Sequence, residues 1–156
     1  MYPDDPMNDY LEEATEELKR LEHIIYVSLK YTRTVDVIIN ALRRMVSTFD
    51  FIIEAYLLKA KEENLIDGLV KSPALRATHL KELYSTDQEF QHYFKFYFFL
   101  KNVLNSKYSK REEFRRHVTM IVELKNATSE IKIDNLVNSE KFLHNFLRLA
   151  FKQIEG

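Results

Sequence analysis

The segment that most constrains the fold covers residues 90–104, FQHYFKFYFFLKNVL, because it is apolar on nearly every side of a helix. Seven aromatic residues lie between Phe90 and Phe99, and Lys95 is the only charged residue among them. A helix that is hydrophobic nearly all round must be packed on nearly all sides. Its 15 residues are too few to cross a bilayer, which needs about 20. We therefore predict the central helix of a bundle here, and no membrane partner.

The chain has 156 residues, a length that suits one domain. It contains only two glycines and three prolines, the residues that tight β-turns need at special backbone dihedrals. We therefore predict an all-α fold, an up-and-down helical bundle of five or six helices in a single domain over residues 1–156. The absence of cysteine excludes disulfides and thiolate metal sites. The first residues are acidic and lack the apolar core of a secretory signal, so we expect a cytoplasmic protein.

Apolar spacing and capping residues place the helices along the chain. Apolar residues three and four positions apart mark an amphipathic helix before residue 31, and three heptads of apolar positions mark a longer one from Val35. Ser72 with Pro73 opens a short helix, and capping-box patterns over residues 86–89 and 109–112 open two more. Helices are therefore predicted over residues 9–31, 35–64, 73–84, 86–104, 109–122 and 139–154. The intervening residues 126–137 should form a loop with an extended piece.

Charge is unevenly distributed in a chain whose net charge is only −1. Residues 1–22 are acidic, whereas residues 101–117 are rich in lysine and arginine. Such a basic segment can meet a phosphate backbone locally, and it can equally be a solvated helix face that balances the acidic N-terminus. The candidate RNA-binding residues in this segment are Lys107, Lys110, Arg115 and Arg116.

Arg111 and His117 are the candidate catalytic residues of the same segment. An arginine is always charged and binds phosphate, and a histidine transfers protons near neutral pH. RNA cleavage by the substrate's own 2′-hydroxyl needs a base for the hydroxyl proton and a cation for the charge that builds on the phosphoryl oxygens. The alternative is a basic helix face in which Glu113 pairs with His117 four residues later.

Arg111, Glu112 and His117 lie between an apolar helix and a final amphipathic helix. This arrangement resembles the HEPN superfamily, whose hallmark is Arg-x(4–6)-His with a polar residue after the arginine. The likeness covers residues 35–154 in helix order, and residues 1–31 would be an added N-terminal helix. It implies a homodimer that acts as a metal-independent ribonuclease, or an inactive relative paired with a nucleotidyltransferase-type antitoxin partner. On one helix, residues six positions apart point about 120° apart around the axis. Arg111 and His117 therefore converge only if the helix begins after Arg111, or if residues of two protomers meet across a dimer.

Two further predictions concern assembly and metals. Phe99 lies within the polar stripe of residues 90–104, which indicates a partner surface there. The competing function is therefore a non-catalytic helical domain for protein–protein interaction or dimerisation. A Glu-x-x-His step ends at His92, but it has no second copy, because Glu140 and His144 are four residues apart. We expect no metal site and no cofactor.

Overall fold

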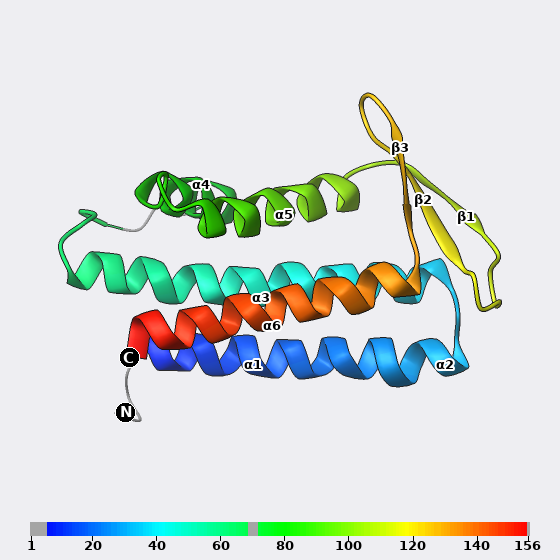
Figure 1. Cartoon of the computed structure of the whole chain (residues 1–156), viewed down its shortest axis with the longest axis horizontal. Helices are drawn as coiled ribbons and strands as arrows, with labels where there is room; N and C mark the ends of the chain where they lie inside the picture. Colours follow the sequence, from blue (N-terminus) through cyan, green and yellow to red (C-terminus); the bar gives the residue numbers. More distant parts are fainter. Residues whose placement is uncertain (1–5, 69–71, 156) are drawn as a thin grey trace.

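The computed structural model describes residues 6–68 and 72–155, and its long helices run side by side along one axis (Figure 1). α3 (Val35–Glu62) lies in the middle. α1 (Pro6–His23) and α6 (Ile133–Glu155) pack against one side of it, and α4 (Pro73–Leu83) and α5 (Gln88–Leu104) pack against the other. α3, and not the segment at residues 90–104, is therefore the central helix. No helix in the described part of the chain is long and apolar enough to cross a membrane.

Two helix starts follow from local sequence. Thr34 caps α3, because its hydroxyl accepts the backbone N–H of Val37. Asp87 caps α5 in the same way, since its carboxylate accepts the N–H of Phe90 at 3.1 Å. The α5 cap therefore lies one residue later than the predicted capping box at residues 86–89. The predicted break before α3 is confirmed.

The N-terminal helix changes its winding along its length. α1 continues through one π-helical turn, Ile24–Ser28, into the short α2, Leu29–Tyr31. The buried residues Leu21, Ile25 and Leu29 are spaced four and four in this region. A π turn contains more residues than an α-helical turn, so this wider spacing keeps the buried side chains on the side that packs against α3.

The chain between α5 and α6 forms a small antiparallel sheet, so the all-α prediction is corrected to a mainly helical fold. Its strands are β1 (Tyr108–Arg111), β2 (Thr119–Glu123) and β3 (Thr128–Ile131), in that spatial order. Arg111 lies opposite Thr119, and Met120 lies opposite Ile131. The predicted helix from residue 109 is wrong because residues 118–122, VTMIV, are mostly β-branched and favour a strand.

α6 begins at Ile133, six residues before the predicted start at residue 139. The side chain of Asn135 accepts the backbone N–H of Lys132 at 2.8 Å and closes the first turn. The extended piece predicted within residues 126–137 is confirmed as β3. Together, β3 and the early start of α6 leave only Lys132 between strand and helix.

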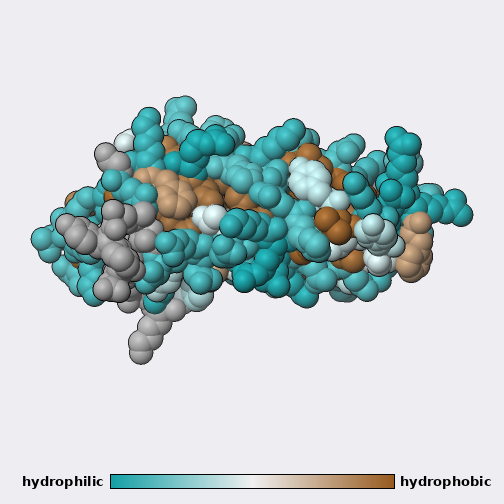
Figure 2. All heavy atoms as spheres, turned by 90° about the horizontal axis from the view of Figure 1, so that it is seen from below, coloured by the Kyte–Doolittle hydropathy of each residue, from teal (hydrophilic) through white to brown (hydrophobic). Residues whose placement is uncertain are grey.

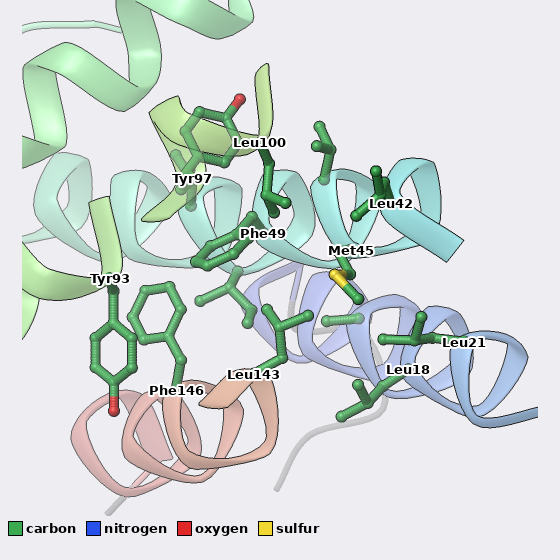
Figure 3. Packing of buried hydrophobic residues seen from close by; sticks show 14 of the residues in the cluster. Leu18, Leu21, Leu42, Met45, Phe49, Tyr93, Tyr97, Leu100, Leu143 and Phe146 are labelled. Atoms are coloured by element: carbon green, nitrogen blue, oxygen red, sulfur yellow. The ribbon is translucent and has the colours of Figure 1, made fainter. Parts of the chain in front are cut away.

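The core is aromatic where α3, α5 and α6 meet (Figure 3). The buried ring of Phe146 on α6 is the shared contact of this cluster. Its centroid lies 5.6 Å from that of Phe49, 5.7 Å from that of Phe90 and 4.3 Å from that of Tyr93. Rings at these separations contribute pair energies beyond the area that they bury. This cluster fixes α6 on α3 and α5.

α5 is only partly enclosed. The central helix predicted at residues 90–104 should bury residues on nearly all its sides; Phe94 and Tyr97 are fully buried, whereas Phe98 and Leu104 are only partly buried. The Tyr97 hydroxyl donates to Oδ1 of Asp50 on α3 at 2.6 Å, and burial raises the pKa of Asp50. The apolar character of residues 90–104 is explained by three separate contacts, with α3, α4 and α6.

Candidate functional site

A polar pocket of about 270 Å³ lies at the end of the molecule that carries the sheet. Three separate parts of the chain line it: the break between α2 and α3, the connection between β1 and β2, and the start of α6. We call it the hairpin pocket, and its lining residues are Arg33, Arg116, His117, Lys132, Ile133 and Asp134. Cationic side chains therefore predominate around it.

The connection between β1 and β2, residues 112–118, is held against the start of α3. The backbone N–H of Phe114 donates to the carbonyl of Arg33 at 2.6 Å. The Glu113 carboxylate accepts the backbone N–H of Val35 at 2.9 Å, which satisfies one of the unpaired donors at the helix N-terminus. Lys110 reaches Glu113 at 3.6 Å. These contacts hold the connection beside Arg33.

Two residues of the connection have left-handed backbone conformations. φ is 58° at Glu112 and 65° at Phe114, a region that bulky side chains rarely adopt. Each such residue costs about 1–3 kcal/mol and persists only where its surroundings hold it. The ring of Phe114 is 75% exposed, so this conformation does not serve to bury it.

The cations of the hairpin pocket are largely uncompensated. Among the described residues, the guanidinium groups of Arg33 and Arg116 have no ion pair or hydrogen bond, and the His117 ring has no hydrogen bond. Lys132 lies 3.8 Å from a carboxylate oxygen of Glu130. The start of α6 adds the positive end of a helix dipole and backbone N–H groups at the pocket. The arrangement suits an anion.

Arg111 does not line this pocket with His117. It ends β1, and its guanidinium donates to Glu130 on β3 at 2.5 Å. Arg111 lowers the pKa of Glu130 through this hydrogen bond. Both partners are roughly half exposed, at 44% and 43%, and such surface pairs contribute little to stability. The structure therefore separates the two predicted catalytic residues: Arg111 forms an ion pair with Glu130, and His117 lines the hairpin pocket.

Of the four predicted RNA-binding residues, one lines the hairpin pocket and three lie outside its lining. Arg116 lines the hairpin pocket. Lys110 lies 3.3 Å from Asp36, whose hydrogen bond raises the pKa of the lysine. Arg115 lies 3.9 Å from Glu112, and Lys107 is exposed just before β1. The alternative pairing of Glu113 with His117 does not occur, because Glu113 caps α3.

Sequence reasoning missed Arg33, Lys132 and Asp134 as pocket residues. Arg33 belongs to the predicted break between helices, which marks it as a residue at a chain reversal. Nothing in the sequence connects it to His117, which lies 84 positions later in the chain. Arg33 and His117 line the same pocket only because the connection between β1 and β2 is bonded to Arg33 and to the start of α3.

Phe99 lines a second, more apolar groove of about 250 Å³ between α5, β3 and α6. Its ring is partly buried, and its centroid lies 6.5 Å from that of Phe96. Leu42 and Leu136 form part of the groove floor and walls. The predicted interface residue is thus neither isolated nor fully exposed.

No protein-family model, no curated protein and no solved structure matches the chain. Within the described residues, the group of three side chains that could hold a metal ion lies between α1 and α6 and shares no residue with the hairpin pocket. The hairpin pocket itself has Asp134 and His117 as its only residues of metal-ligating type.

Proposed function

We propose that this protein binds single-stranded RNA at the hairpin pocket and cleaves it without a metal ion, as a HEPN-like protein. The proposal rests on one observation: the guanidinium groups of Arg33 and Arg116, which form no ion pair among the described residues, line the same pocket as the accessible ring of His117. The pocket would hold one backbone phosphate. Guanidinium groups bind phosphate oxygens in a planar, two-pronged geometry, and the start of α6 adds backbone donors.

Exposed aromatic rings near the pocket support a single-stranded ligand. Phe114 is 75% exposed and is bonded through its backbone to Arg33. Tyr31, two residues before Arg33, is 86% exposed. Unpaired bases stack on such rings, and each stacked base contributes about 1–3 kcal/mol. A basic pocket with aromatic rings near it is the pattern of proteins that bind single strands through backbone and base faces together.

The proposed cleavage uses the 2′-hydroxyl of the bound RNA. His117 takes the hydroxyl proton, the 2′-oxygen bonds to the adjacent phosphorus, the bond from phosphorus to the 5′-oxygen breaks, and His117 returns the proton to the leaving 5′-oxygen. The products are a 2′,3′-cyclic phosphate and a 5′-hydroxyl. Arg33 and Arg116 stabilise the charge that builds on the phosphoryl oxygens. The HEPN resemblance gives this role to Arg111, but the ion pair of Arg111 with Glu130 favours the two pocket arginines.

Binding is tested by fluorescence anisotropy with a short labelled single-stranded RNA over a range of salt concentrations. Arg116→Ala should weaken binding and reduce the slope of log K against log salt by about 0.7, the contribution of one phosphate contact on a single strand. Arg115→Ala is the matched control, because it removes the same charge one position away, outside the pocket. Equal losses of RNA affinity in Arg116→Ala and Arg115→Ala would contradict binding at the pocket and would indicate a diffuse basic surface instead.

Cleavage is tested in EDTA, with the RNA ends analysed for cyclic phosphate. His117→Gln should abolish cleavage and retain binding, because glutamine cannot accept and return the proton. Arg111→Ala should retain cleavage if the pocket arginines stabilise the phosphoryl oxygens, and should lose it if the HEPN assignment of that residue holds. Intact RNA after incubation with the wild-type protein would contradict the catalytic part of the proposal.

Self-association through the α5–α6 groove is the second candidate function, and the apolar rings there favour it. Phe96 and Phe99 lie in the groove, and Phe142 lies beside it. A homodimer would cover these rings, as the HEPN resemblance implies, and a nucleotidyltransferase-type antitoxin would be an alternative occupant. Sedimentation of the wild-type protein and of Phe99→Glu tests the idea, because a buried charge at the groove should shift a dimer to monomer.

A further inference from the structure

Three potential metal ligands meet between α1 and α6, away from the hairpin pocket. Glu140 and His144 lie one helical turn apart on the same face of α6. Glu22 reaches them from α1, which runs beside α6 in Figure 1. The Nε2 atom of His144 lies 2.6 Å from Oε1 of Glu22 and 2.9 Å from Oε1 of Glu140. One ligand atom from each of the three residues lies within 4.8 Å of the other two.

A simple ion pair satisfies this cluster poorly. Both carboxylates approach the same nitrogen of His144, which carries at most one proton. Glu140 is also only 6% exposed, so water cannot complete its hydrogen bonding freely. Buried carboxylates are costly unless they are paired or coordinate a metal. A divalent cation would neutralise both carboxylates and accept the Nε2 lone pair at the same time.

The surroundings of the cluster resemble an open coordination site. A cavity of about 470 Å³ adjoins it, and Glu22 and His144 form part of the cavity wall. Leu18, Leu147 and Phe151 give that cavity an apolar lining. Figure 2, seen from the side of α1 and α6, shows apolar surface between hydrophilic side chains on this face. A metal held by three protein ligands keeps a position for a further ligand, as catalytic zinc sites do.

The π-helical turn Ile24–Ser28 begins two residues after Glu22. Single π turns inside helices occur frequently at functional sites, because they change the direction in which neighbouring side chains point. Tyr26 lies in this turn, and burial first, with the nearby carboxylates of Glu140 and Glu22, raises the pKa of its phenol.

We propose that Glu22, Glu140 and His144 bind one divalent first-row transition metal ion, with an open coordination position toward the cavity between α1 and α6. One imidazole and two carboxylates match the mixed nitrogen and oxygen preference of zinc, iron(II) and manganese(II). Metal distances of about 2.0–2.2 Å need only small side-chain rotations from the observed contacts. The sequence pattern alone did not indicate this site, because Glu22 lies 118 residues before Glu140.

The test is calorimetric titration of zinc into the tag-free full chain after EDTA treatment and dialysis. We expect one zinc per chain, with affinity at least about tenfold lower in Glu22→Gln and His144→Gln, since even residues that only orient ligands cost about 10–100-fold. His92→Gln is the matched control, because Glu89 and His92 on α5 form a Glu-x-x-His step and are not part of the cluster of three ligands. Its zinc affinity should equal that of the wild type.

Cobalt(II) provides a second readout through its visible absorption, which reports coordination by the protein directly. The band should appear in the wild type and in His92→Gln, and in Glu22→Gln it should need at least about tenfold more cobalt to reach the same intensity. Glu22 is partly exposed, and glutamine can still accept a hydrogen bond from His144, so this variant should fold, as circular dichroism will check. The proposal is overturned if the wild type takes up no metal, or if uptake is equal in Glu22→Gln, His144→Gln and the wild type.

Discussion

The ring of Phe146 should contribute more to stability than any ring at the edge of α5. It is fully buried and lies within 5.7 Å, centroid to centroid, of rings from both α3 and α5. Phe146→Ala removes a large buried side chain and leaves a cavity, which costs about 3–5 kcal/mol. A chain of this size loses about 2–4 °C of melting temperature per kcal/mol, so the shift should be about 10 °C.

Phe98→Ala is the comparison, because the two changes delete the same atoms. Phe98 is only partly buried, and it contacts Tyr97 and the ammonium group of Lys81. Losing about half of the burial energy of a phenylalanine costs about 1–1.5 kcal/mol. Urea denaturation monitored by circular dichroism gives both free energies of unfolding. Equal losses in the two variants, or a loss below about 1.5 kcal/mol for Phe146→Ala, would refute the assignment of the core.

Two further predictions concern single carboxylates. Burial raises the pKa of Asp50 above 3.8 in the folded protein. The contribution of Asp50 to stability is therefore largest below pH 3.8 and is lost as the pH rises through the folded pKa. Asp50→Asn should remove this pH-dependent contribution, measured as the difference between the stability–pH curves of the variant and the wild type. Glu113→Ala removes the acceptor for the Val35 N–H and should cost about 0.5–2 kcal/mol, as a lost helix cap does. Hydrogen exchange should accelerate at the amides of Val35 and Phe114, whereas Glu123→Ala on β2 should leave both unchanged.

The helices were predictable where local signals agree with packing. The heptad seam from Val35 and the pair Ser72–Pro73 each led to the observed helix start. The sheet was missed because few glycines and a capping-box pattern both argued for helix at residue 109. The turn positions that usually need glycine are occupied by Glu112 and Phe114, whose φ values are 58° and 65°. The contacts of the connection between β1 and β2 with α3 hold that conformation, and local sequence does not reveal them.

Sequence reasoning identified Arg116 and His117 of the hairpin pocket, but it missed the other members of both candidate sites for one physical reason. Each combines residues from distant parts of the chain: Arg33 with His117 in the hairpin pocket, and Glu22 with His144 between α1 and α6. Periodicity and spacing report neighbours along a helix or strand, and they carry no information on such pairs. The prediction paired Arg111 with His117 because they are close in sequence, yet Arg111 at the end of β1 instead bonds to Glu130 on β3, on the other side of β2.

α6 contributes to both sites, because Lys132 and Asp134 lie at its start and Glu140 and His144 lie on the following turns. Detaching this one helix from α1 and α3 would therefore abolish both sites together. A ligand that binds only the attached form stabilises that form by RT ln(1 + [L]/Kd). Occupancy of either site must then lower the population of chains in which α6 is detached, and cleavage by a protease within α6 slows in proportion when detachment and reattachment are fast. Local unfolding of α6 thus couples the two sites thermodynamically, without any change in their folded geometry.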